Sequence, residues 1–183
     1  MANHLLQHGI ARFSLRSAAD LVGASARMLV HHFGSKERLL SEALALVRTR
    51  QREYFVRAQA GPMTSFDRLF HDSWATLASD DYLRYFVLNL EALALALREP
   101  RRYQTFLSTT TEEWRIGLTE TLVGLGFSPD DGSSMSTMYV AALRGLLLDL
   151  VVTRDRERMD KAVVIVGEKL KEDLTRGPRV PPP

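Results

Sequence analysis

The sequence has no cysteine among its 183 residues. Disulfide bonds, thiolate metal ligands and cysteine nucleophiles are therefore excluded. No uninterrupted apolar run reaches the 18 or more residues of a membrane-spanning helix. The first residues, MANHLLQHG, lack both the basic start and the long apolar middle of a secretory signal. We therefore expect a cytoplasmic protein without a membrane partner.

Motifs for catalysis and cofactor binding are also missing. His31 and His32 are adjacent, so on a helix their side chains point about 100° apart, and no nearby carboxylate completes a metal site. The serines lack a neighbouring acid and histidine pair, and the glycines lack the spacing of a phosphate-binding loop. We expect no enzyme, no metal and no cofactor. A weak enzyme acting in an apolar cavity is a hypothesis that nothing in the sequence supports.

Charge is divided unevenly along the chain. Residues 1–60 contain nine Lys or Arg against four Asp or Glu, a net charge of +5. Residues 61–183 contain fifteen against eighteen, a net charge of −3. A basic first third is typical of a nucleic-acid-binding end, although a merely solvated helix face has a similar composition.

Residues 14–38, SLRSAADLVGASARMLVHHFGSKER, contain the strongest local pattern. Ser14 can cap a first helix, and Gly23 can end it with a positive φ. Ser25 can cap a second helix that extends to Phe33. Two short helices joined by a glycine turn form a helix-turn-helix.

The second of these helices is predicted to enter a DNA major groove. Small side chains at Ala18 and Ala19 let it cross closely over the first helix, so that its outer face projects. Arg27 can bind guanine bidentately, Met28 can touch a thymine methyl group, and His31 can reach a base edge or a phosphate. His32 is instead expected to pack inside the helix-turn-helix. Phosphate contacts, which set the register without specifying sequence, are expected from four residues. They are Ser14, Arg16, Ser25 and Lys36.

The spacings from His8-Gly9 to Ser35-Lys36-Glu37, closed by HHFGSKE, resemble the DNA-binding domain of TetR-type one-component transcriptional repressors. The resemblance is close over residues 8–46 and only architectural beyond them. It implies an all-α homodimer in which a three-helix helix-turn-helix domain (1–46) is joined by a long helix to a helical effector-binding and dimerisation domain (47–176). Residues 177–183, GPRVPPP, are expected to be a disordered tail.

Further helices are predicted from apolar periodicity, caps and breaks. The helix at 36–59 would start at the DNA and end in the body, which makes it the expected lever between effector and operator. A short helical start is predicted at 128–131, before Gly132. The other predicted helices are 2–8, 64–77, 80–98, 101–125, 133–153 and 156–175.

Aromatic side chains on four successive helices are expected to line part of a cavity for a small apolar or amphipathic effector. For any single residue, plain core packing is the stronger interpretation. Asn89 and Glu91 are candidate polar selectors. The complete predicted set is Phe70, Trp74, Tyr82, Phe86, Asn89, Phe106, Trp114, Met138 and Tyr139.

The last two predicted helices are suited to dimerisation. The helix at 133–153 is apolar nearly all round, so one side can face its own core and the other a partner subunit. The helix at 156–175 has one apolar stripe, and two such helices from each subunit would form a four-helix bundle, as in TetR-like proteins. The predicted interface comprises Ala141, Ala142, Gly145, Leu148, Val152, Met159, Val163, Val166 and Leu170.

The sequence therefore predicts a DNA-binding regulator, in the first place a repressor released from a palindromic operator by its effector. The alternative is a helical small-molecule-binding dimer with impaired DNA binding. Two features favour the alternative: the first helix is short, and Val30 stands where the family usually has an aromatic residue that contacts the DNA backbone. The short first helix has three possible explanations: the true start lies upstream of Met1, the chain is trimmed, or the helix is truly short.

Overall fold

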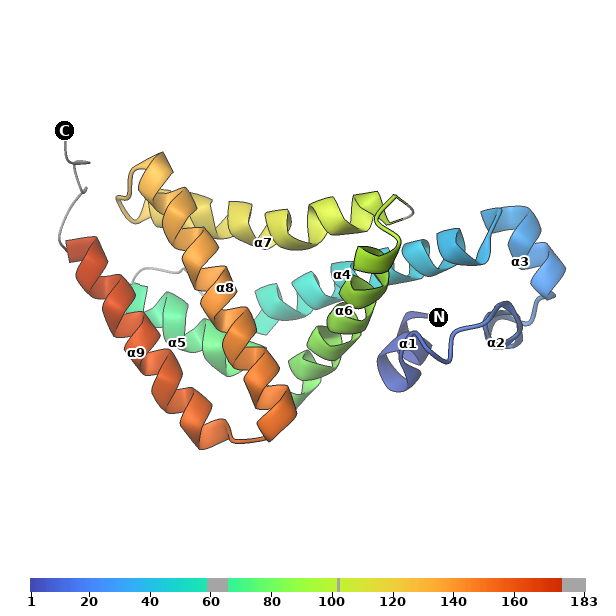
Figure 1. Ribbon diagram of the computed structural model, residues 1–183, viewed down its shortest axis with the longest axis horizontal. Helices are drawn as coiled ribbons and strands as arrows, with labels where there is room; N and C mark the ends of the chain where they lie inside the picture. The colour runs from blue at the N-terminus through green and yellow to red at the C-terminus, as the bar shows by residue number, and fades with distance from the viewer. Residues whose placement is uncertain (59–65, 102, 176–183) are drawn as a thin grey trace. The chain divides into compact units, whose positions relative to one another are not determined.

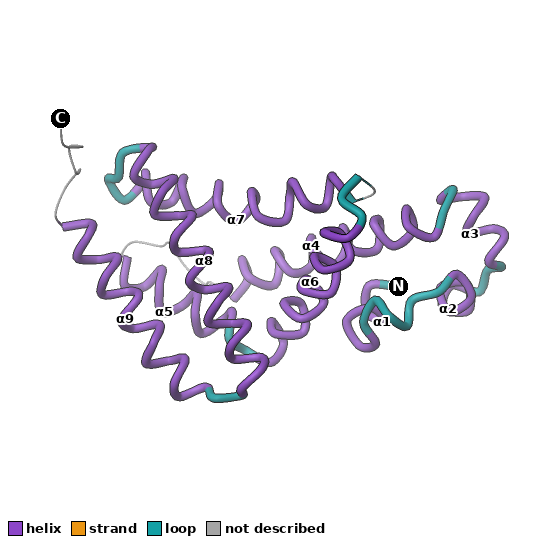
Figure 2. Tube along the Cα trace, viewed as in Figure 1, coloured by secondary structure: helices purple, strands orange, loops and turns teal. Residues whose placement is uncertain are grey.

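The computed structural model describes residues 1–58, 66–101 and 103–175, without the side chains of 66–70, 104–111, 170 and 173–175 (Figure 1). Most of these residues are helical, short loops join the helices, and the described part of the chain contains no strand (Figure 2). The predicted all-α class is therefore confirmed. The predicted cap at Thr64 and the predicted tail lie outside the described residues. The helices are α1 (Ala2–His8), α2 (Leu15–Val22), α3 (Ala26–Phe33), α4 (Lys36–Ala58), α5 (Phe66–Leu77), α6 (Asp80–Arg98), α7 (Gln104–Gly124), α8 (Pro129–Thr153) and α9 (Arg156–Thr175).

The helices belong to two compact units. The described residues of Met1–Ala58 and Asp80–Thr109 form unit 1, and those of Gln59–Ser79 and Thr110–Pro183 form unit 2. Packing thus places α6 with α1 to α4. The boundary expected at residue 46 separates DNA binding from effector binding rather than two packing units, and it stays a prediction.

Local caps fix the ends of the short helices in unit 1. The Ser14 hydroxyl accepts a hydrogen bond from the Ser17 N–H at 3.0 Å, and the Ser17 hydroxyl accepts one from the Ser14 N–H at 3.0 Å. Gly23 ends α2 with φ 64°, a left-handed conformation that glycine adopts without a steric penalty. Ser25 caps α3 by accepting the Met28 N–H at 3.2 Å. The helix bounds predicted at 2–8, 15–22, 26–33 and 80–98 match the structure.

The core of unit 1 is formed by α1, α2, α3, α4 and α6 together. Leu5 of α1 is fully buried, and Phe13 and Leu39 join it in the same cluster. Leu88 and Ala92 of α6 belong to this cluster too. Because α6 buries apolar residues against the helix-turn-helix side of the unit, the core of unit 1 extends beyond the first 46 residues.

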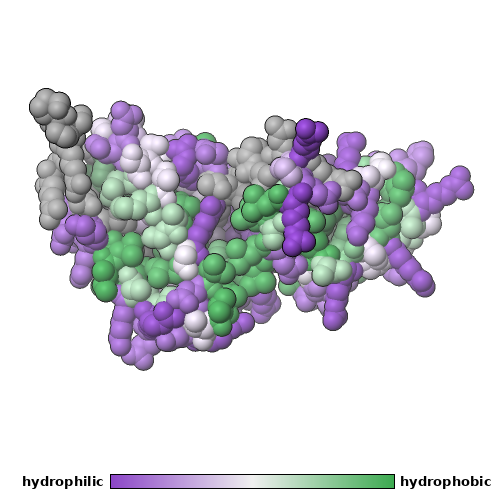
Figure 3. All heavy atoms as spheres, viewed as in Figure 1, coloured by the Kyte–Doolittle hydropathy of each residue, from purple (hydrophilic) through white to green (hydrophobic). Residues whose placement is uncertain are grey.

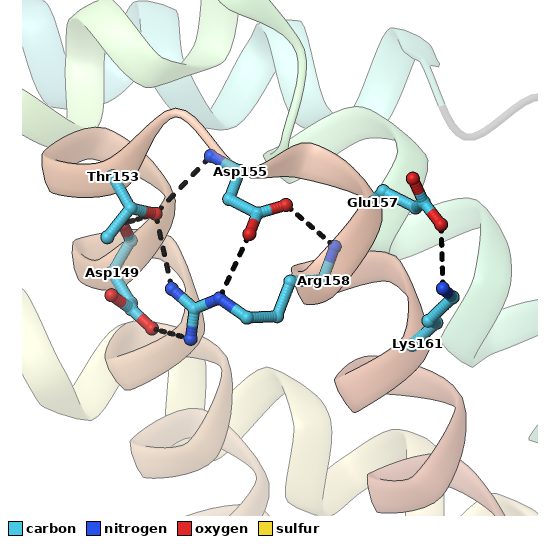
Figure 4. A network of polar contacts seen from close by, with 6 residues as sticks. All are labelled: Asp149, Thr153, Asp155, Glu157, Arg158 and Lys161. Carbon is cyan, nitrogen blue, oxygen red and sulfur yellow. Dashed lines mark hydrogen bonds and ion pairs between the residues drawn. The ribbon is translucent and has the colours of Figure 1, made fainter.

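In unit 2, α8 and α9 lie side by side and α5 packs against α9 (Figure 1). The turn between α8 and α9 is crosslinked by Arg158, whose guanidinium contacts Asp149 at 2.9 Å and Asp155 at 3.2 Å (Figure 4). Lys161 and Glu157 form a further ion pair at 2.6 Å within α9 (Figure 4). These charges are largely exposed, so each pair contributes little stability, and only the Arg158 contacts span the turn.

The prediction of a separate helical start before Gly132 was wrong. Helix α8 is continuous from Pro129, with Ser128 as its N-cap, so Gly132 lies within its first turns. A Cβ added at Gly132 would lie 3.4 Å from Cγ2 of Val123 on α7. The position is thus buried against α7, and the added Cβ would be in van der Waals contact with that helix.

By length and composition, α8 is also the one helix among the described residues that could cross a membrane. This is weak evidence, because buried helices of globular proteins have the same composition. Tyr139, Leu143, Leu147 and Leu150 are buried along one side of α8, which is the pattern of a helix packed in a core.

Candidate nucleic-acid interface

Helices α2 and α3 pack closely because their contact residues are small. Ala18 and Ala19 are both buried, and Leu29 of α3 is buried in the same core cluster. The predicted close crossing is therefore present in the structure. It leaves the opposite side of α3 exposed.

That exposed side contains the residues predicted to read bases. Arg27, Met28 and His31 are exposed on α3, and the Met28 side chain retains 62% of its accessible surface. The predicted phosphate contacts are exposed as well: Ser14, Arg16, Ser25 and Lys36. All seven predicted DNA contacts thus lie on the surface, although no structural observation tests the contacts themselves.

Two further residues of α3, His32 and Val30, affect which contacts this surface can make. We expected His32 to pack inside the helix-turn-helix, but its side chain is exposed and its ring makes an edge contact with Phe33 at 4.7 Å. Val30 is exposed and, as a valine, cannot donate a hydrogen bond to a phosphate. The outer side of α3 therefore offers an additional imidazole but lacks the aromatic residue common in the resembled family.

The start of α4 adds a second polar position near this surface. Ser35 caps α4 by accepting the Arg38 N–H at 3.1 Å, and exposed Lys36 lies in the first turn. Backbone N–H groups at a helix start, together with a lysine, suit a phosphate oxygen. Among the described residues, no three His, Asp or Glu side chains form a group that could hold a metal ion.

The predicted effector residues are divided between the two units. Tyr82 and Phe86 are buried and Asn89 is half-buried in unit 1. In unit 2, Trp74 and Tyr139 are buried, Trp114 is half-buried and Met138 is exposed. The side chains of Phe70 and Phe106 lie outside the described residues. Effector binding by this set stays a prediction.

Sequence reasoning missed an aromatic cluster between α4 and α6. The ring of Tyr82 lies 6.4 Å from those of Tyr54, Phe55 and Tyr85, measured between ring centroids. The Tyr82 hydroxyl accepts a hydrogen bond from the buried Gln51 amide at 3.0 Å. The periodicity of α4 could have identified Gln51 as a polar residue on the buried side, but not its partner.

Two of the predicted effector residues in unit 2 have polar partners within that unit. The Trp74 indole N–H donates to Asp160 Oδ1 at 2.6 Å, and Arg156 Nε donates to the same oxygen at 2.7 Å. Partial burial raises the pKa of Asp160. The two hydrogen bonds and the Arg156 charge together lower it by more, so the net shift is downward. Burial raises the pKa of the Tyr139 hydroxyl far above its ordinary value, against a smaller lowering by the Ser73 side chain.

The predicted dimer residues fall into exposed and buried sets. Ala141, Gly145, Leu148 and Val152 are exposed on α8, and Ala142 is half-buried. In contrast, Met159 and Val163 of α9 are buried within their own unit, and Val166 is half-buried. The Leu170 side chain lies outside the described residues. Dimerisation through this set stays a prediction, with α8 providing most of its exposed part.

Comparison with solved structures shows where else this fold occurs. A transcriptional regulator from Rhodococcus sp. Rha1 matches with a TM-score of 0.74 and 19% identity over 94% of this chain and 92% of its own. A protein provisionally described as a TetR-family transcriptional regulator from Rhodococcus sp. matches with a TM-score of 0.68 and 20% identity over 93% and 92%.

A provisionally described transcriptional regulator from Streptomyces coelicolor A3(2) matches with a TM-score of 0.68 and 23% identity over 91% of this chain and 92% of its own. No protein-family model and no curated protein matches the sequence. At these identities the similarity establishes the fold, which is the all-α architecture expected from the sequence.

Proposed function

We propose that the chain is a DNA-binding transcriptional regulator of the TetR type. The observation that carries this proposal is the outer side of α3, where Arg27, Met28 and His31 are exposed while Leu29 anchors the helix in the core. A short helix held in this way can enter a major groove without exposing its own packing residues. The similarity of the fold to solved transcriptional regulators supports the same conclusion.

Within this function, the side chains on α3 select bases. The Arg27 guanidinium can donate two parallel hydrogen bonds to O6 and N7 of guanine. Met28 offers an apolar contact for a thymine methyl group, and His31 reaches a base edge or a phosphate.

The residues around α3 set its register on the DNA backbone. The Ser25 hydroxyl uses its oxygen to cap α3, so its proton can be donated to a phosphate. Arg16 and Lys36 add positive charge, and Ser14 contributes a second hydroxyl beside the start of α2. The excess of positive charge in residues 1–60 favours association with any DNA, specific or not.

The regulator is proposed to act as a homodimer joined through α8 and α9. Ala141, Gly145, Leu148 and Val152 recur at steps of four, three and four, so these exposed residues share one side of α8. Ile165 adds an exposed apolar side chain on α9. Apolar surface is visible over both helices (Figure 3). Such a stripe at helical spacing suits a bundle with a second copy of the same helices.

As a repressor, the dimer would leave a near-palindromic operator when a small apolar or amphipathic effector favours another conformer. A coupling of about 1–3 kcal/mol would suffice. The second candidate is a small-molecule-binding dimer with impaired DNA binding. Val30 favours this candidate because its side chain cannot make the phosphate contact expected at that position. The full burial of Leu5 favours the regulator, because it shows that even a short α1 packs against the helix-turn-helix core.

The test is fluorescence anisotropy with the intergenic DNA upstream of the protein's own gene, measured across a salt series against an unrelated duplex of equal length. We expect preferential binding that weakens steeply with salt. Arg27→Ala should raise the Kd for this DNA about tenfold or more while changing the Kd for the unrelated duplex by about twofold.

Arg98→Ala is the matched control, because it removes the same charge from an exposed position on α6. Equal affinity of the parent protein for both duplexes would favour the small-molecule-binding dimer. Preferential binding by the parent that survives Arg27→Ala unchanged would instead contradict the recognition role of Arg27.

A further inference from the structure

The connection between α1 and α2 is held by a side chain from a distant helix. The Ile10 N–H donates a hydrogen bond to Oε2 of Glu91 on α6 at 2.7 Å, across 81 residues of sequence. Glu91 lies between Leu88 and Ala92, which are both buried in the core shared with α1 to α4. The carboxylate therefore approaches the connection from a helix face that is already fixed by packing.

Gly9 makes this approach possible. A Cβ added at Gly9 would lie 2.8 Å from both carboxylate oxygens of Glu91, closer than real Cβ contacts allow. Gly9 also has φ 72°, which side-chain-bearing residues rarely adopt. The backbone here thus has both the conformation and the open space that an incoming carboxylate requires.

The bound segment leads directly into the helix-turn-helix. The Ile10 carbonyl accepts a hydrogen bond from the Phe13 N–H at 2.9 Å, and the Phe13 side chain is buried. The next residue, Ser14, caps α2. The restrained Ile10 amide therefore lies four residues before Ser14, the residue that caps α2.

We propose that Glu91 is a positioning residue that orients α2 and α3 for DNA binding by holding the Ile10 amide. This inference rests on the proposed function, which it deepens. The sequence made Glu91 a candidate polar selector for an effector, which stays a prediction; in the structure its carboxylate accepts the Ile10 N–H. A movement of α6 would thus be passed to the helix-turn-helix through a named hydrogen bond.

The direction in which Glu91→Ala changes DNA affinity distinguishes a positioning role from an effect of the Glu91 charge alone. Removing a negative side chain from a DNA-binding protein strengthens its attraction to phosphates, so Glu91→Ala should tighten binding if Glu91 acts only as a charge. If Glu91 positions the helix-turn-helix, the same change weakens binding to the preferred DNA. The two explanations therefore predict opposite results.

The experiment compares three variants of the full chain by anisotropy, on the upstream intergenic duplex and on an unrelated duplex. Glu91→Ala should raise the Kd for the intergenic duplex about tenfold, the size expected when a charge-assisted hydrogen bond is lost. Its Kd for the unrelated duplex should stay within about twofold, because non-specific binding depends on charge rather than orientation. Glu91→Gln keeps an oxygen acceptor for the Ile10 N–H and should lie close to the parent protein.

Glu42→Ala is the matched control for charge, since Glu42 is an exposed glutamate on α4 of the same unit. It should leave binding unchanged or slightly tighter. Hydrogen exchange at the Ile10 amide gives a readout that needs no DNA, and we expect exchange about tenfold faster in Glu91→Ala than in the parent. Melting temperatures confirm that each variant is folded.

The outcomes distinguish the two levels of the proposal. If the parent prefers the intergenic duplex and Glu91→Ala binds it as well or better, Glu91 has no positioning role. Unchanged exchange at Ile10 would overturn the proposal as well, because the contact would not restrain the amide. If the parent shows no preference at all, the proposed function fails, and with it the positioning role.

Discussion

Arg154 ends α8 in a conformation that its side chain disfavours. Its φ is 59°, and it is the one residue other than glycine with positive φ among the described residues. Its N–H donates to the Leu150 carbonyl at 2.9 Å, so the left-handed geometry closes the helix. Arg154→Gly should raise the free energy of unfolding by about 0.5–1 kcal/mol, because glycine adopts this conformation without strain.

The measurement is urea denaturation of Arg154→Gly beside Arg154→Ala. Alanine removes the long side chain but keeps the Cβ, so it should leave the free energy of unfolding near that of the parent. Equal stability of the glycine and alanine variants would show that backbone conformation at this turn has no measurable cost.

Single residues also show how far the sequence can be interpreted. Ser14, Gly23 and Ser25 were predicted correctly because capping depends on residues three or four positions away. The exposure of His32 was predicted wrongly, because its place depends on how α3 is rotated against the core. The partner of Glu91 could not be predicted, since Ile10 becomes its neighbour only through the packing of α6 on α1.

At the scale of helices, α1 tests whether a short first helix still supports the unit. It has seven residues, and Leu5 is its fully buried large side chain. Leu5→Ala should lower the free energy of unfolding by about 2–5 kcal/mol, because it leaves a cavity in the core of unit 1, where α1 packs on α4 and α6. The exposed Gln7 of the same helix gives the control Gln7→Ala, which should change stability by less than about 0.5 kcal/mol.

Urea denaturation followed by circular dichroism measures both variants. A Leu5→Ala loss no larger than that of Gln7→Ala would mean that α1 is not part of the cooperative core. That result would favour the small-molecule-binding alternative, in which the helix-turn-helix is poorly supported.

The contact between α5 and α9 provides a prediction of pH dependence. Asp160 accepts hydrogen bonds from Trp74 and Arg156, and its pKa is lowered on balance. A carboxylate with a lowered folded pKa stabilises the protein above its unfolded pKa of about 3.9, and this contribution is lost as the pH falls through the folded pKa. Asp160→Asn should therefore be less stable than the parent at pH 7, and the difference should shrink below about pH 4.

Urea denaturation at a series of pH values between 7 and 3 measures this difference. Asp20→Asn is the control, because it removes an exposed carboxylate on α2 in the same way. It shows how the free energy of unfolding depends on pH when Asp160 is intact. A difference between Asp160→Asn and the parent that stays constant across this range would contradict the role assigned to the Asp160 charge.

The pattern of helices was more predictable than their packing. Periodicity and breaks located α4, α6 and α9 to within a few residues, because each is amphipathic or bounded by a turn. The sequence did not predict that α6 would share a core with the helix-turn-helix, since apolar periodicity shows which side is buried but not against what. For the same reason, the predicted cavity residues could not be assigned to one unit.

For the whole molecule, the proposed dimerisation rests on the exposed side of α8. Leu148 and Val152 retain 46% and 72% of their accessible surface, and they lie one turn apart on the same side of α8. Leu148→Glu places a charge where a second copy would bury it, and burying an unpaired charge is strongly unfavourable. We expect sedimentation velocity to show a dimer for the parent and a monomer for Leu148→Glu at the same concentration.

Leu97→Glu is the matched control, because Leu97 is an exposed leucine on α6 in unit 1. It introduces the same charge and should leave the dimer intact. Since a two-fold operator needs both recognition helices, Leu148→Glu should also weaken binding to the intergenic duplex, while Leu97→Glu should not. A Leu148→Glu protein that remains dimeric would move the interface away from this side of α8, and a parent that sediments as a monomer would contradict the homodimer itself.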